Sequence, residues 1–110
     1  MRLTRLLVTM RGAKRIGELA DQIARRSQDP LWQRVGRRAA TMTPAEAKGY
    51  IRAWSAEVIV AQIDLARVAH RELSEADESR LTTAARERVV EMLLSRIRAA
   101  RSREAARRAA

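Results

Sequence analysis

The residue type best suited to metal or acid–base chemistry occurs once in this chain, as His70. A metal site would need further ligands at helical spacing, but no second histidine exists and position 67, three residues before His70, is an arginine rather than a glutamate. His70 continues a line through Ile59, Ile63 and Ala66 on one helix. We therefore interpret His70 as a half-buried side chain near a helix C-terminus, where the helix dipole favours its protonated form.

Two carboxylates, Glu57 and Asp64, are seven residues apart and could act as an acid–base or metal-binding pair. Arg67 and Arg71 follow Asp64 at three and seven residues, so ordinary surface ion pairing explains these acids more simply. The chain has no cysteine and no nucleophile, phosphate-loop or dinucleotide motif. We predict no enzymatic activity, and we assign no catalytic, cofactor-binding or metal-binding residue and no small-molecule ligand.

The strongest chemical signal is the net charge of +10, carried by 23 basic and 13 acidic side chains. An excess of this size favours acidic or phosphate-bearing partners, so nucleic acid is one candidate. A solvated basic surface is the competing interpretation, because alanine and arginine each occur 21 times, a bias that a GC-rich coding sequence would also produce. The expected phosphate contacts are Arg25, Arg26, Arg37, Arg38, Arg101, Arg103, Arg107 and Arg108.

Residues 15–38 also contain a weak helix-turn-helix pattern. In that interpretation a recognition helix would begin near Pro30 and present Gln33, Arg34 and the doublet at 37–38 to DNA. The connection from residue 24 to 30 is longer than the usual tight turn and contains no glycine.

The elements that carry these residues are predicted to be helices throughout. Ala, Leu, Arg and Glu dominate, whereas Gly and Pro total six residues. Helical apolar spacing over 3–27, on both sides of Gly12, predicts one helix or two. Residues 27–30 should close this segment, because the residue before a proline is disfavoured in a helix, and Asp29-Pro30 should start a short second helix.

Two capping boxes mark the later helices. In Thr43-Pro44-Ala45-Glu46 the threonine and the glutamate can each accept a hydrogen bond from the other's backbone amide, and Ser74 to Asp77 repeats the pattern. The first box predicts a long central helix over 44–73, and the second predicts a last helix whose core positions extend to Ile97, beyond which the helix either continues or frays. Residues 98–110 form a basic extension rich in Arg and Ala.

The central helix also carries a heptad seam, whose steps of four and three residues are typical of helices packed lengthwise against one another. The residues expected to mediate self-association are Ile51, Trp54, Val58, Leu65 and Val68.

The sequence thus predicts an all-α fold, a small bundle of about four helices formed by a single domain over 1–97 and completed by dimerisation. We predict a non-enzymatic interaction or assembly protein whose partner is a second copy or another protein, with nucleic-acid binding as the alternative. The interaction hypothesis is favoured because the seam is a geometric pattern, whereas the positive charge behind the nucleic-acid hypothesis partly reflects a bias in composition. No apolar run is long enough to cross a membrane and cysteine is absent, which favours a reducing, cytoplasmic location.

Overall fold

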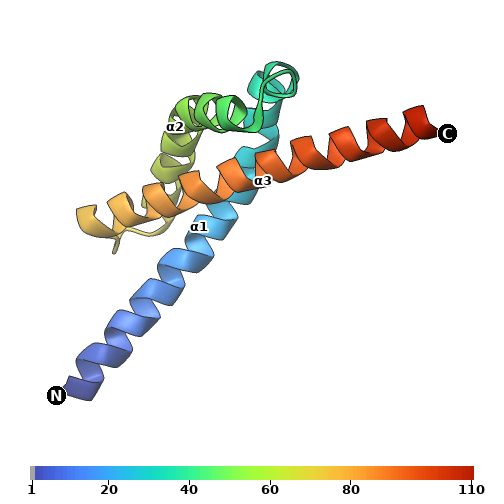
Figure 1. Ribbon diagram of the computed structural model, residues 1–110. Helices are drawn as coiled ribbons and strands as arrows, with labels where there is room; N and C mark the ends of the chain where they lie inside the picture. Colours follow the sequence, from blue (N-terminus) through green and yellow to red (C-terminus); the bar gives the residue numbers. More distant parts are fainter. Residues whose placement is uncertain (1) are drawn as a thin grey trace.

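The chain forms three α-helices, α1 (Arg2–Ala39), α2 (Pro44–Ala69) and α3 (Glu75–Ala109). This is seen in a computed structural model that describes the backbone from residue 2 and the side chains from residue 12. The all-α prediction is confirmed, but the prediction of about four helices is wrong. Each helix packs against both others, and one end of α1 and the opposite end of α3 project beyond the shorter α2 (Figure 1). The result is an elongated bundle with principal extents of 63 × 27 × 21 Å.

There are three helices rather than about four because α1 continues through Pro30. The sequence predicted that one helix would end and another begin at this proline. A proline inside a helix removes one backbone hydrogen bond and is locally unfavourable. Leu31 and Val35 after it, and Ala24 before it, are fully buried on one continuous face. Burial of this face outweighs the local preference, and the predicted turn of a helix-turn-helix motif is therefore absent from residues 24–30.

Both capping boxes form as predicted. The Thr43 side chain accepts a hydrogen bond from the Glu46 amide, and the Glu46 carboxylate accepts one from the Thr43 amide. Ser74 and Asp77 make the same reciprocal pair at the start of α3. Each pair satisfies backbone N–H groups that have no partner within the helix, which fixes where α2 and α3 begin.

The end of α2 differs from prediction. α2 ends at Ala69, four residues before the expected Leu73, and residues 70–74 form the connection to α3. α3 continues past the last core position, Ile97, so that residues 98–109 are helical. α1 runs without a break through Gly12.

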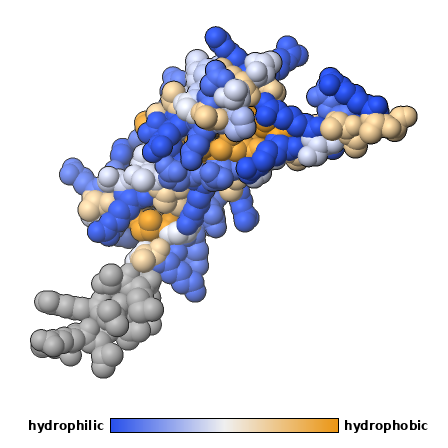
Figure 2. Space-filling view, viewed as in Figure 1, coloured by the Kyte–Doolittle hydropathy of each residue, from blue (hydrophilic) through white to orange (hydrophobic). Residues whose placement is uncertain are grey.

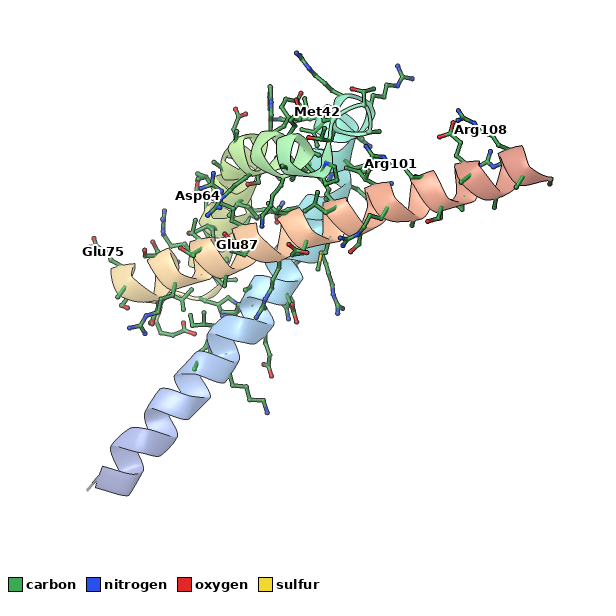
Figure 3. The ribbon with its side chains drawn as sticks, viewed as in Figure 1. Met42, Asp64, Glu75, Glu87, Arg101 and Arg108 are labelled. Atoms are coloured by element: carbon green, nitrogen blue, oxygen red, sulfur yellow. The ribbon has the colours of Figure 1, made fainter. Side chains whose placement is uncertain are left out.

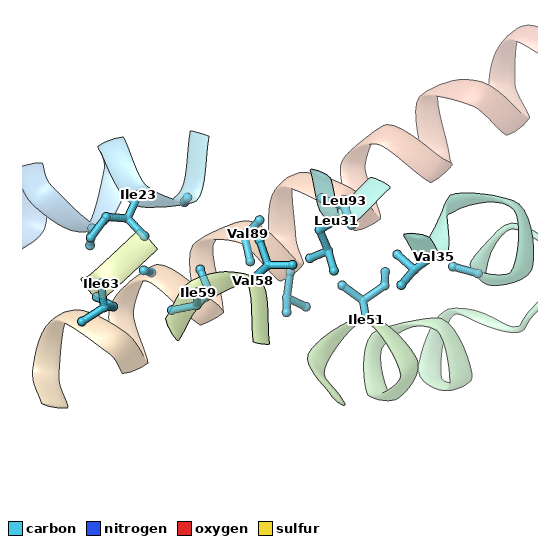
Figure 4. Close-up of a cluster of buried hydrophobic side chains, with 14 of the residues drawn as sticks. Ile23, Leu31, Val35, Ile51, Val58, Ile59, Ile63, Val89 and Leu93 are labelled. Carbon is cyan, nitrogen blue, oxygen red and sulfur yellow. The ribbon is translucent and has the colours of Figure 1, made fainter. Parts of the chain in front are cut away.

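The core lies along the line where the three helices meet (Figure 4). Each helix contributes fully buried aliphatic side chains. The largest of these are Leu31 and Val35 from α1, Ile51 and Ile59 from α2, and Leu81, Val89, Val90 and Leu93 from α3. Within the described part of the chain, no helix combines the length and apolar character needed to span a bilayer.

Candidate functional site

The outer face of α2 exposes large apolar side chains. The exposed fraction is 42% for Trp54, 62% for Leu65 and 72% for Val68. With Ala61, which is also exposed, they fall within about 60° of arc, since successive helical residues are about 100° apart. We call these four residues, Trp54, Ala61, Leu65 and Val68, the α2 stripe.

Two members of the predicted seam do not belong to this stripe. Ile51 is fully buried and Val58 is 8% exposed, both inside the monomer core. Their inclusion in a surface for self-association is therefore wrong. The heptad pattern combined residues from two adjacent faces of α2. One face packs against α1 and α3, and the other remains at the surface.

Intramolecular ion pairs flank the α2 stripe. Glu57 Oε2 lies 3.1 Å from Arg34 Nη1 of α1, and Asp64 Oδ1 lies 3.1 Å from Arg67 Nη1. Arg67 also contacts Glu78 of α3 through Nε at 2.7 Å. Hydrogen bonding to Arg67 lowers the pKa of the Glu78 carboxyl below its usual value. Glu57 and Asp64 therefore each form an ion pair with an arginine at the protein surface, as the sequence predicted.

The predicted phosphate contacts are all exposed, but they do not form one group. Arg25 and Arg26 lie midway along α1, away from the others. Arg37 and Arg38 occupy the last turn of α1, beside the start of α2, where the Arg38 guanidinium lies 5.8 Å from the centre of the Tyr50 ring.

Arg101 connects α3 to the end of α1. Its Nη2 donates hydrogen bonds to the carbonyls of Ala40 at 2.9 Å and Met42 at 2.7 Å, just beyond the C-terminus of α1 (Figure 3). It thereby satisfies carbonyl groups that a helix end leaves without partners. Arg103, Arg107 and Arg108 lie further out on the projecting end of α3.

Arg98, which lies one helical turn before Arg101, was not among the predicted phosphate contacts. These two arginines and four apolar residues line a surface pocket of about 140 Å³ between the start of α2 and α3. The other lining residues are Pro44, Ala47, Leu94 and Ile97. The spacing of three residues between the arginines was the available signal, because such residues share a helix face.

His70 occupies the C-terminal cap of α2 with its side chain 33% exposed. Its Nδ1 lies 3.3 Å from an Arg15 nitrogen and 3.7 Å from Glu72 Oε1. Arg15 and Glu72 are themselves ion-paired. The histidine is therefore one member of a polar cluster that joins α1 to the α2–α3 connection.

Comparison of the chain with protein-family models, with curated proteins and with solved structures found no match in any of the three.

Proposed function

We propose that this chain is a non-enzymatic interaction protein that self-associates through the α2 stripe. The observation that carries the proposal is the exposure of Trp54, Leu65 and Val68 along one side of a helix whose inner side is already packed. Single exposed apolar residues are ordinary on protein surfaces. A row of them at helical spacing is typical of a surface that packs against another helix.

Charge favours a second copy of the chain as the occupant of this surface. α2 holds three acidic and three basic side chains, whereas α1 has a net charge of +7 and α3 of +3. Two copies of a chain with net charge +10 repel each other through most of their surfaces. The neutral α2 is the helix through which they can meet with least repulsion.

The spacing of the stripe suits an antiparallel pair of α2 helices. Trp54 and Val68 are each seven residues from Ala61. A two-fold axis at Ala61 would therefore place Trp54 against the partner's Val68, and the small alanines would allow the helix axes to approach closely. The Trp54–Val68 contact occurs twice, once on each side of the axis, as an isologous dimer requires.

The affinity expected from this surface is modest. Burying a whole Leu or Val side chain contributes about 1.5 to 3 kcal/mol, so the exposed parts of Leu65 and Val68 contribute roughly 1 to 2 kcal/mol each. Six such side chains in a two-fold dimer give roughly 6 to 12 kcal/mol, against an association cost of about 4 kcal/mol or more. We expect a dissociation constant of about micromolar or weaker.

Sedimentation velocity across a protein concentration series tests the proposal. The unaltered chain should shift from monomer to dimer by about 0.5 mM, a range suited to micromolar affinity. Leu65→Ser combined with Val68→Ser should remain monomeric with unchanged helicity. Val60→Ser is the matched control, because Val60 is a 53% exposed valine of α2 outside the stripe. A monomeric unaltered chain at the highest concentration, or dimerisation that survives the double substitution, would refute the proposal.

A further inference from the structure

The excess positive charge is concentrated at one end of the bundle. Residues 37–50 and 98–110, which meet where Arg101 contacts the end of α1, contain eight basic and two acidic side chains. At the opposite end, residues 2–16 and 64–83 contain eight basic and five acidic side chains. The fold therefore gives the first end a charge of +6 and the other a charge of +3. A charge distribution of this kind attracts a polyanion to a defined place.

Most of this charge lies on residues 98–109, the projecting end of α3, which we call the arginine arm. The arm is helical and exposed along its length, apart from the partly exposed Ala100 (Figures 1 and 2). Among the described residues, no hydrogen bond or ion pair joins residues 102–109 to α1 or α2. Alanine and arginine are strong helix formers, and Arg108 pairs with Glu104 one turn earlier at 2.8 Å. The arm can thus stay helical without covering any core.

The arginines of the arm form two rows on nearly opposite sides of the helix. At about 100° per residue, Arg98 of one row and Arg103 of the other border an arc of roughly 140°. Arg98, Arg101 and Arg108 make up the first row, and Arg103 and Arg107 the second. This arc between Arg98 and Arg103 carries only the small residues Ala99, Ser102, Ala106 and Ala109, whereas Ala100 and Glu104 lie in the arc on the other side of the helix.

We infer that the arginine arm binds duplex DNA by lying in the major groove, with its two arginine rows contacting phosphates on the two sides of the groove. The major groove is about 12 Å wide and admits one α-helix. A helix in that position has phosphates on both flanks and base edges in front of it. The two rows and the arc of small side chains between them match that arrangement.

Other polyanions match the arm less well. A helix that binds a membrane surface needs a face of large apolar residues, and the arm offers only alanine. Single-stranded nucleic acid is held by aromatic side chains that stack on bases, and the arm has none. An acidic peptide would be attracted by the same positive charge, but its carboxylates have no fixed spacing that could match the two rows of arginines.

Fluorescence anisotropy of the full chain with a mixed-sequence DNA duplex of about 20 base pairs, measured across a salt series, tests this inference. Because Arg101 already bonds to carbonyls at the end of α1, the arm offers four phosphate contacts, and these predict that log affinity falls against log salt with a slope of about −4. Arg103→Gln with Arg107→Gln should make the slope less steep by about 2. Arg71→Gln with Arg80→Gln is the matched control, because it removes the same charge from exposed positions at the opposite end of the bundle and should leave the slope almost unchanged.

A second variant tests the helical form of the arm without changing its charge. Ala105→Pro should break the helix eight residues beyond Ile97, the last core position, and so reduce DNA binding at least tenfold while the bundle stays folded. Equal losses from both arginine pairs, undiminished binding by Ala105→Pro, or no duplex binding at low salt would each overturn the inference. So would tighter binding to an RNA duplex, to single-stranded DNA, to polyglutamate or to anionic vesicles.

Discussion

Gly36→Ala should destabilise the bundle, although replacing glycine by alanine inside a helix ordinarily stabilises it by about 1 kcal/mol. Gly36 is a buried residue of α1 whose α-carbon faces the indole ring of Trp32, one turn earlier. A Cβ at this position would lie 2.8 Å from Trp32 Cε2 and 2.9 Å from Cδ2. These distances are too short for carbon atoms not bonded to each other, so the ring must move.

The Trp32 ring has little freedom to move because an arginine of α3 also lies against it. The Arg96 guanidinium of α3 lies 4.4 Å from the ring centre, and its Nη1 lies 3.0 Å from Asp29 Oδ1. Overpacking costs about 1 to 3 kcal/mol, and a weakened cation–π contact costs about 0.5 to 2 kcal/mol. After subtraction of the helix-propensity gain, Gly36→Ala should lower the free energy of unfolding by about 0.5 to 4 kcal/mol.

Gly49→Ala is the matched control, because nothing lies within 4 Å of a Cβ placed at Gly49. It should raise the free energy of unfolding by about 1 kcal/mol, so the two variants should differ by about 1.5 to 5 kcal/mol. Urea unfolding followed by circular dichroism measures both. In a Trp54→Phe background, which leaves Trp32 as the only tryptophan, Gly36→Ala should also shift the fluorescence of the native state. Equal stabilisation by both substitutions would show that the Trp32 ring is not held in place.

Three further substitutions test the core, a helix start and an ion pair. Ile51→Ala should lower the free energy of unfolding by about 3 to 4 kcal/mol at any protein concentration, because Ile51 is buried within the monomer, whereas Val60→Ala should change it by about 0.5 kcal/mol or less in the same urea assay. Thr43→Ala should cost about 1 kcal/mol of unfolding free energy, measured by thermal melting, because it removes the capping hydrogen bond of α2. Arg67 lowers the pKa of Glu78, so the stabilisation that this carboxylate gives is present above its usual pKa of 4.5 and is lost as the pH falls through the lower folded-state pKa. Glu78→Gln should therefore be less stable than the unaltered chain at neutral pH, and the difference should shrink in acid; a gap independent of pH would contradict this reasoning.

The helix starts could be predicted because their signals are local. A capping box consists of side chains that bond to backbone groups three residues away, so Thr43 and Glu46 specify the start of α2 whatever packs around it. The same holds for Ser74 and Asp77 at the start of α3. Neither position depends on knowing which helices are neighbours.

The continuation of α1 through Pro30 could not be judged from local signals. Asp29-Pro30 has the composition of a helix start, and the cost of an internal proline is local. The compensating stabilisation comes from tertiary packing, because a break in α1 would remove Leu31 and Val35 from the core formed with α2 and α3. One indication was present in the sequence: Leu31 follows Ala24 by seven residues, which keeps the apolar face in register across the proline.

The predicted seam failed in part for a related reason. Heptad spacing identifies apolar positions on a helix, but it does not say which of two adjacent faces meets the rest of the same chain. Ile51 and Val58 face the core, whereas Trp54, Leu65 and Val68 lie outside it. The division depends on where α1 and α3 cross α2, and that is decided by the whole packing arrangement.

The two proposed surfaces can act independently because they lie on different parts of the bundle. The arginine arm leaves the bundle beside Pro44, at the start of α2, whereas the proposed two-fold axis passes Ala61. Seventeen residues of helix separate these points, or about 25 Å at 1.5 Å per residue. In an antiparallel pair the two α2 starts would therefore lie about 50 Å apart at opposite ends of the dimer, which exceeds the turn of about 34 Å that separates adjacent half-sites on DNA. A dimer of this geometry would bridge two duplexes rather than clamp one, so Leu65→Ser with Val68→Ser should abolish bridging, seen by light scattering, without changing the affinity of a single arm.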